Sequence, residues 1–261
     1  MRTLIVQSYR TSDVAPWITD CLRSVRSWAA GLGYAYEFLD DSFFDYAPVW
    51  VRKRCGSQIL PITDVARLYL LRDRLRVGWG RVVWIDADVL VFAPEKFVLQ
   101  DAPYSLCFEL WSRTAANGEP EFGEAINNAV LQMTPQQPLL DFLIFASEEV
   151  LRTRAQEQIN TVVVGTRLLS ALGSVMPLRV LQNVGLFTPQ LVRDIAAGGS
   201  ELLARWAIRF GRPIGAANLC ASMQGRQFSG ARVDAADMQR AVDMLLRTCG
   251  DVVNVPLLAS A

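Results

Sequence analysis

Residues 81–92 read Arg-Val-Val-Trp-Ile-Asp-Ala-Asp-Val-Leu-Val-Phe, and this stretch decides the fold. The run from Val82 to Ile85 is apolar and rich in β-branched and aromatic residues, which is typical of a strand buried on both faces. Asp86 and Asp88 end the run, and residues two apart in a strand project to the same side. Neighbouring carboxylates at a sheet edge repel each other unless a cation lies between them. The stretch therefore predicts a site for Mn²⁺ or Mg²⁺ and a phosphorylated substrate.

A structural role for the two aspartates stays open at this point. An Asp-x-Asp pair is short, and after a strand it often only caps a turn or a helix. The buried strand before the pair favours the cation site, because ligands bind at strand edges in α/β sheets.

The composition excludes several classes of protein. The chain has 261 residues, of which 51% are hydrophobic, so it can form a large core. Its formal net charge of zero argues against a nucleic-acid partner, whose binding surface would be basic. The sequence contains no histidine, which excludes histidine zinc sites, Ser-His-Asp triads and imidazole bases.

The cysteines and the apolar segments predict a cytoplasmic protein. There are five cysteines, an odd number, without Cys-x-x-Cys spacing, so we expect reduced thiols. The apolar run at the N-terminus is too short for a signal peptide, and no stretch reaches the length of a membrane span. The segment Trp206–Phe210 mixes apolar residues with arginine, so peripheral contact with anionic lipid at the inner membrane is an alternative. A core-packing helix is the preferred interpretation of that segment.

Hydrophobic periodicity predicts alternating strands and helices. We expect an α/β fold with a mostly parallel central sheet flanked by helices, in a single domain of residues 1–261 with a helical C-terminal portion at 191–261. The segments 40–55 and 112–123 are expected to be loops. The expected strands are 3–8, 34–39, 82–85, 104–110, 129–133 and 178–181, and the expected helices are 13–30, 61–76, 138–152 and 165–172.

Two motifs together resemble a known family. The helix at 61–76 carries Asp64 and Arg67, and the segment Gly78-Trp79-Gly80 leads into the Asp-x-Asp strand. This pairing resembles the GT-A fold glycosyltransferases that use nucleotide sugars. It is most similar to the group that includes the yeast outer-chain mannosyltransferases and the clostridial glucosylating toxins. Residues 81–94 are also similar to the glycogenin-like family, and Ile126 to Leu131 is similar to the Asn-containing strand entrance of both.

The resemblance covers about residues 1–190, which it marks as a nucleotide-sugar-binding core. It implies a metal-dependent transferase that moves a hexose from a UDP- or GDP-sugar to a glycan or a lipid-linked acceptor with retention of configuration. In this interpretation Asp86 and Asp88 are the catalytic pair, Asp88 ligates the cation, and Asp86 contacts the ribose, the sugar or metal-bound water. The remaining implied positions are Gln7, Ser8 and Tyr9 for the nucleotide and Asn127 and Asn128 for the donor sugar. Packing stays open as the role of Tyr9, and a turn role stays open for the two asparagines.

Asp64 and Arg67 have two interpretations. They lie three residues apart on a helix and share a face, which is compatible with a buried structural ion pair. The functional alternative is a clamp on the donor sugar, with the carboxylate accepting from hydroxyls and the guanidinium donating. The resemblance favours the clamp.

The chain also departs from the family. Members often place a histidine near the C-terminus against the metal or diphosphate, and here Asn218 stands at that place, with Ser222 as a further weak oxygen ligand. A catalytically degenerate sugar-nucleotide-binding subunit is therefore one alternative. A haloacid-dehalogenase-type phosphatase, which also has Asp-x-Asp after a strand, is another. If the transfer inverted configuration, its base would be Glu109, Glu121 or Glu124.

Overall fold

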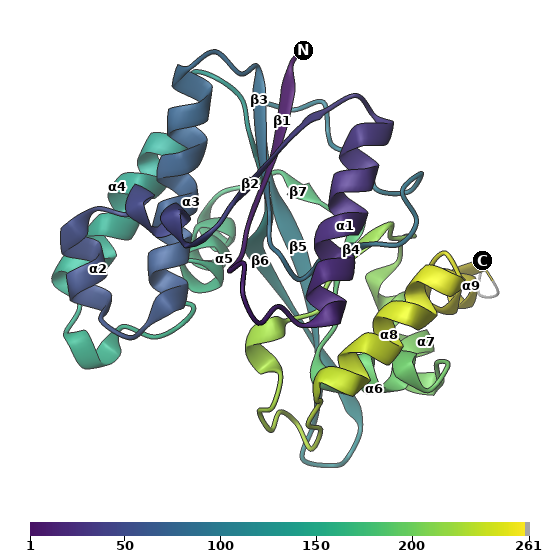
Figure 1. The fold of residues 1–261 in the computed structure, drawn as a ribbon. Helices are drawn as coiled ribbons and strands as arrows, with labels where there is room; N and C mark the ends of the chain where they lie inside the picture. The colour runs from purple at the N-terminus through teal and green to yellow at the C-terminus, as the bar shows by residue number, and fades with distance from the viewer. Residues whose placement is uncertain (259–261) are drawn as a thin grey trace.

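The fold is an α/β arrangement around a central sheet, seen in a computed structural model that describes residues 1–258 (Figure 1). The strands are β1 (Thr3–Ser8), β2 (Ala35–Leu39), β3 (Arg81–Ile85), β4 (Val89–Val91), β5 (Tyr104–Thr114), β6 (Pro120–Met133), β7 (Val180–Leu181), β8 (Val184–Leu186) and β9 (Ala216–Asn218). The α-helices are α1 (Pro16–Gly31), α2 (Val49–Cys55), α3 (Ile59–Arg76), α4 (Pro138–Thr153), α5 (Thr166–Val175), α6 (Pro189–Ala196), α7 (Glu201–Phe210), α8 (Ala235–Arg247) and α9 (Asp251–Leu258). Short 3-10 helices are η1 (Asp41–Tyr46), η2 (Gln156–Gln158) and η3 (Ala221–Met223).

Within residues 1–258, the strands form a six-stranded sheet in the order β2-β1-β3-β6-β5-β7 and a three-stranded sheet in the order β4-β9-β8. The pairs β1–β2, β1–β3 and β5–β7 are parallel, whereas β6 runs antiparallel to both β3 and β5. The central sheet is therefore mixed, with three of its five strand pairings parallel. The short connection between β5 and β6 explains this, because parallel neighbours need a crossover of a dozen residues or more.

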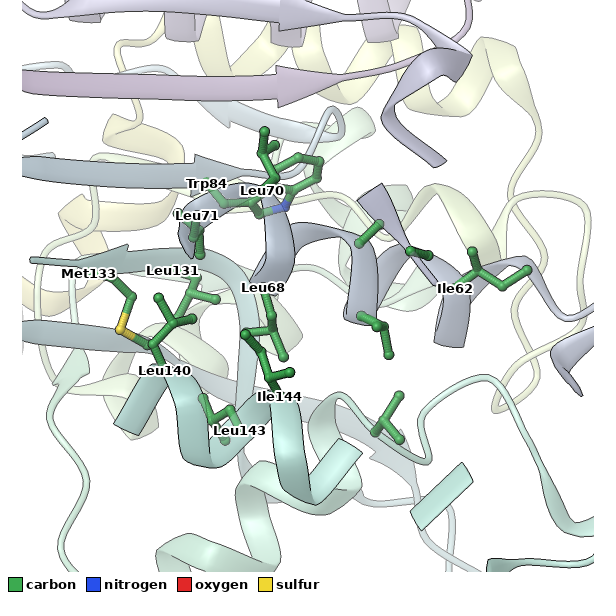
Figure 2. Close-up of a cluster of buried hydrophobic side chains, with 14 of the residues drawn as sticks. Ile62, Leu68, Leu70, Leu71, Trp84, Leu131, Met133, Leu140, Leu143 and Ile144 are labelled. Atoms are coloured by element: carbon green, nitrogen blue, oxygen red, sulfur yellow. The ribbon is translucent and has the colours of Figure 1, made fainter. Parts of the chain in front are cut away.

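Helices cover both faces of the central sheet. In Figure 1, α2, α3 and α4 lie on one side, and α1, α8 and α9 lie on the other. Figure 2 shows α3 packed between the sheet and α4, with Leu68 toward Ile144 of α4 and Leu70 and Leu71 near Trp84. Because α3 is covered by the sheet and by α4, it is apolar around much of its circumference. This packing fixes the helix that carries Asp64 and Arg67.

The segment Trp206–Phe210, for which contact with lipid was the alternative, packs into the core. Helix α7 buries Leu203, Trp206 and Phe210, and the Trp206 Nε1 donates to the backbone oxygen of Leu110 at 3.0 Å. The preferred interpretation as a core-packing helix is therefore confirmed. In the part of the chain that the structure describes, no helix combines the length and the apolar character that a membrane crossing requires.

Two segments expected to be loops are regular. Residues 40–55 form η1 and α2, because the Asp40 carboxylate accepts from the Ser42 backbone at 2.9 Å and Pro48 then precedes α2. Most of residues 112–123 belongs to strands, since β5 continues to Thr114 and β6 begins at Pro120. Arg113, Thr114 and Glu121 on these strands are exposed, so the polarity of the segment resembled that of a loop. The expected strand 129–133 is the end of this longer β6. The cysteines are unpaired, as expected, with four buried and Cys249 exposed.

We predict that Gly215→Ala destabilises the protein by about 2 to 3 kcal/mol, because overpacking at a rigid site forces the backbone apart. A Cβ at Gly215 would lie 2.3 Å from the Phe97 nitrogen and 2.5 Å from the Ala93 oxygen, just before β9. Gly123→Ala is the matched control, since its Cβ would have no neighbour within 4 Å. Urea unfolding of both variants checks this, and equal losses of stability would contradict it.

Candidate active site

Asp86 and Asp88 lie in the turn between β3 and β4, one step beyond the strand. The backbone nitrogen of Asp86 donates to the backbone oxygen of Ala129 in β6 at 2.8 Å, and the backbone oxygen of Asp88 accepts from the backbone nitrogen of Leu219 at 3.0 Å. Both aspartates therefore lie beyond the strand that ends at Ile85, in a turn rather than in extended strand geometry. Both side chains nevertheless line one cavity of about 540 Å³, which is within the range of small-molecule sites.

This cavity brings together most of the residues that the sequence predicts for the site. It is lined by β1, α3, the β3–β4 turn, β6 and the segment after β9. The predicted residues in its lining are Ser8, Tyr9, Asp64, Arg67, Asp86, Asp88, Asn127, Asn128, Asn218 and Ser222.

Arg67 holds two of the cavity's carboxylates. Its Nη2 lies 3.3 Å from Asp64 Oδ1, and its Nη1 lies 3.1 Å from Asp86 Oδ1. The guanidinium is nearly buried, with Arg67 only 4% exposed. The Trp84 Nε1 donates to the same Asp86 oxygen at 2.6 Å. The structural ion pair that the sequence left open is therefore present, and it includes a second carboxylate that the helix spacing could not indicate.

Asp88 makes a different set of contacts. Its Oδ2 accepts from the Ala221 nitrogen at 2.7 Å, and no ion pair involving Asp88 occurs within residues 1–258. Burial and then the neighbouring Asp86 charge raise the pKa of Asp88 to about 6. Burial also raises the pKa of Asp86, against the opposing effect of Arg67. The pKa of Asp64 is raised to about 6, again mainly by burial. The cavity thus disfavours the negative charge of its own carboxylates.

Asn127 and Asn128 form hydrogen bonds with the carboxylates and the backbone of the site. The Asn127 Nδ2 donates to Glu109 Oε2, and its Oδ1 accepts from the Ala129 nitrogen at 3.0 Å, so both ends of this amide are used. The Asn128 Nδ2 donates to Asp64 Oδ1 at 3.0 Å, and the Asn128 backbone oxygen accepts from Arg67 at 2.6 Å. Only the Asn128 side-chain oxygen is left without a hydrogen bond to the described residues.

The structure does not bring Gln7 into the cavity. Gln7 is fully buried, its Nε2 donates to the Asp86 backbone oxygen at 3.1 Å, and its Oε1 accepts from the Tyr36 hydroxyl at 3.1 Å. It lies inside β1, whereas Ser8 and Tyr9 follow at the strand end and line the cavity. Gln7 therefore supports the turn that carries Asp86 and is not placed to contact a ligand.

The C-terminal residues reach the cavity through β9. This strand pairs with β4, and the chain then bends at Cys220, whose φ of 54° is left-handed. The Asn218 Oδ1 accepts from the Cys220 nitrogen at 2.7 Å, which stabilises the bend. Asn218 and Ser222 line the cavity, although one lone pair of the Asn218 oxygen is already used.

Of the three glutamates considered as a base, only Glu109 lies in the cavity lining. Glu121 and Glu124 are exposed and pair with Arg113 and Arg209. Glu109 is 1% exposed, and burial raises its pKa to about 7. Its Oε1 is buried and has no hydrogen-bond partner among residues 1–258.

Sequence reasoning missed several contributors to the cavity. Among them are Arg10, which follows Tyr9, and Trp111 and Arg226, while the segment 161–166 forms another part of the wall. Gly165 packs so closely that a Cβ there would lie 2.6 Å from Asp64 Oδ2. No motif links these positions to the Asp-x-Asp stretch, so only the tertiary structure reveals them.

The acidic groups do not form a complete metal site by themselves. Within residues 1–258, no three or more acidic or cysteine side chains converge closely enough to hold a metal ion. Asp86 and Asp88 are the two carboxylates that the β3–β4 turn supplies.

Comparison with known proteins finds glycosyltransferases among the solved structures. One involved in glycosylation of the major capsid of PBCV-1 has a TM-score of 0.46 and 11% identity over 92% of this chain and 98% of that chain. The galactosyltransferase LgtC, solved with donor and acceptor sugar analogs, has a TM-score of 0.43 and 14% identity over 92% and 95% of the two chains. Mouse xyloside xylosyltransferase 1 has a TM-score of 0.46 and 11% identity over 85% and 98%. No protein-family profile and no curated protein matches the chain.

We predict that Arg67→Met lowers the free energy of unfolding by about 3 to 5 kcal/mol, because it leaves buried carboxylates without their cation. Arg72→Met is the control, since Arg72 pairs with the exposed Asp141 at 3.5 Å. Urea unfolding at pH 8 measures both. Equal effects of the two substitutions would show that the buried ion pairs are dispensable.

The raised pKa of Glu109 predicts a pH-dependent stability. A carboxyl whose pKa rises from 4.5 unfolded to about 7 folded favours the folded state below pH 4.5, and this advantage is lost as the pH rises through 7. Glu109→Gln should therefore gain about 2 to 3 kcal/mol relative to wild type between pH 5 and pH 8. Urea unfolding at both pH values tests this, with the exposed Glu119→Gln as control. A stability difference that stays constant with pH would contradict it.

Proposed function

We propose that this protein is a GT-A glycosyltransferase that moves a hexose from a UDP- or GDP-sugar to a glycan or lipid-linked acceptor. The observation that carries the proposal is the meeting of Asp64, Arg67, Asp86 and Asp88 in one cavity where β3 ends. The cavity volume of about 540 Å³ suits a nucleotide sugar. The proposed transfer retains the anomeric configuration, as the sequence resemblance implies.

The carboxylates of the β3–β4 turn fit a divalent cation that the substrate helps to hold. Asp86 accepts through Oδ1 and Asp88 through Oδ2, which leaves Asp86 Oδ2 and Asp88 Oδ1 without a bond to the described residues. Mn²⁺ or Mg²⁺ is commonly held by one or two carboxylates together with substrate phosphates. Asp88 and Asp86 would hold the cation, with Asn218 or Ser222 as weaker oxygen donors. A bound cation supplies stabilisation of the negative charge on the departing diphosphate.

The donor sugar is assigned to the side of the cavity formed by α3 and β6. Asp64 Oδ2 and the Asn128 side-chain oxygen remain as acceptors for sugar hydroxyls. Arg67 is occupied by Asp64 and Asp86, so it orients these carboxylates and Asp64 contacts the sugar. Ser8 and Tyr9 lie at the end of β1, where Tyr9 offers an aromatic face to the base.

Two arginines supply positive charge for the diphosphate. Arg10 and Arg226 line the cavity, and neither forms an ion pair with a described residue. Guanidinium groups bind phosphate oxygens through paired N–H donors. Two alternative functions have no specific observation in their favour. A degenerate binding subunit would keep the donor site without transfer. A phosphatase would need Asp86 as a free nucleophile, whereas Asp86 is paired with Arg67 and Trp84.

The proposed function predicts metal-assisted binding of a nucleotide sugar. We expect UDP- or GDP-sugars to raise the melting temperature of the protein in the presence of Mn²⁺, with a smaller effect in EDTA. Asp88→Asn should abolish the Mn²⁺-dependent part, because it removes the carboxylate that has no cationic partner. Asp101→Asn is the control, since Asp101 is exposed and lies outside the cavity lining. Thermal-shift assays with a panel of nucleotide sugars measure these effects.

Each outcome of the assay has a clear meaning. Failure of every nucleotide sugar to stabilise the protein would overturn the donor site. Binding without any transfer or hydrolysis of the donor would favour the degenerate subunit. Once transfer is observed, NMR of the product decides between retention and inversion at the anomeric carbon.

A further inference from the structure

The cavity contains a buried carboxyl group that the donor assignment leaves unused. Glu109 lies in the middle of β5, and only its Oε2 is bonded, to the Asn127 amide. Its Oε1 is buried and has no hydrogen-bond partner within residues 1–258. No arginine or lysine of the described chain forms an ion pair with Glu109, unlike Asp64 and Asp86. A buried polar group without a partner is costly, and a ligand hydroxyl is one group that would satisfy it.

An aromatic surface lies beside this carboxyl. Trp111 follows Glu109 by two residues on β5, so both side chains project to the same side of the strand, and both line the cavity. The residue opposite Trp111 on β6 is Gly123, and the space beside Gly123 is open within 4 Å. Gly123 therefore places no side chain over the Trp111 ring from across the strand pair. On another side it packs against Phe228, with ring centroids 5.6 Å apart.

A hydroxyl acceptor on the same side of β5 as an indole that lines the cavity matches the chemistry of a sugar ring. The carboxylate oxygen accepts from a hydroxyl group, and the flat apolar face of the indole packs against the C–H groups of the ring. Glu109 and Trp111 lie on β5, whereas the donor-sugar residues lie on α3, β6 and the β3–β4 turn. The two groups of residues thus approach the same cavity from different elements.

We propose that Glu109 and Trp111 form the acceptor subsite, in which Glu109 Oε1 accepts a hydrogen bond from the attacking hydroxyl of a glycan and Trp111 packs against its ring. This inference rests on the proposed function and names the glycan among its possible acceptors. During transfer the acceptor oxygen bonds to the anomeric carbon, and the bond from that carbon to the diphosphate breaks with its electron pair on the diphosphate. The hydroxyl proton leaves with the diphosphate, so Glu109 orients the acceptor and is not consumed.

The experiment separates acceptor use from donor use in wild type, Glu109→Gln, Trp111→Ala and Trp111→Phe. Three quantities are measured: donor binding by thermal shift, donor hydrolysis to free sugar, and transfer to a panel of methyl glycosides and disaccharides. Saturation-transfer NMR with the nucleoside diphosphate present reports acceptor binding directly. Controls are Glu119→Gln at the exposed tip of the same hairpin and Trp79→Ala, which lies outside the cavity lining.

We expect Glu109→Gln and Trp111→Ala to reduce transfer to sugars by about tenfold or more, which corresponds to the loss of one good contact of about 1.4 kcal/mol. Donor binding and hydrolysis should stay within about twofold of wild type, because the donor contacts are intact. Trp111→Phe should keep most of the transfer, since it keeps an aromatic face.

A parallel fall of hydrolysis and transfer in Glu109→Gln would place this residue on the donor and overturn the acceptor subsite. Unchanged transfer in both Glu109→Gln and Trp111→Ala would also overturn it. A wild type that binds the donor but neither binds nor glycosylates any sugar of the panel would exclude a glycan as the ligand of this subsite. A wild type that binds no donor would instead refute the proposed function, so the two failures are distinguishable.

Discussion

The buried ion pairs of Arg67 are the interaction on which the rest of the site depends. Its guanidinium joins Asp64 of α3 to Asp86 of the β3–β4 turn and also donates to the backbone of β6. A buried charge must keep its partners, because an uncompensated one costs several kcal/mol. The geometry of α3 relative to the end of β3 is therefore fixed by electrostatics as well as by the apolar packing seen in Figure 2.

Hydrogen bonds of residues 127–129 of β6 connect Arg67 and Asp64 with Glu109 on the opposite wall of the cavity. The pairing of β5 with β6 shifts register between Ser105 and Cys107, and the irregularity leaves polar groups of 127–129 available for other bonds. Ala129 accepts from the Asp86 nitrogen, and Asn127 joins Ala129 to Glu109. One irregular strand thus connects Asp64 and Asp86 with the buried glutamate, so the two walls are held in one hydrogen-bonded network.

The sequence was sufficient for those parts of the site that depend on local spacing. The strand before Asp86 and the i, i+3 relation of Asp64 and Arg67 follow from strand and helix periodicity. It was not sufficient where tertiary contacts decide. Gln7 is near the end of the expected strand and was predicted to contact the nucleotide, but its side chain is buried inside the sheet. The helices in 40–55 did carry local signals in Asp40 and Pro48, whereas the contribution of Arg226 depends on packing between distant segments, for which one sequence carries no local signal.

Asp86 and Asp88 of the turn differ in their charged neighbours. Asp86 is neutralised by Arg67, so a cation gains less from it than the short Asp-x-Asp spacing suggests. Asp88 has no positive partner in the described chain, and its pKa is raised to about 6 by burial and by Asp86. Any cation in the cavity would therefore relieve mainly the unfavourable charge of Asp88. Glu109 differs in that its buried Oε1 lacks a hydrogen bond, which a neutral hydroxyl donor can supply. An asymmetric cavity of this kind suits a substrate whose anionic end and hydroxyl-bearing end bind at different places.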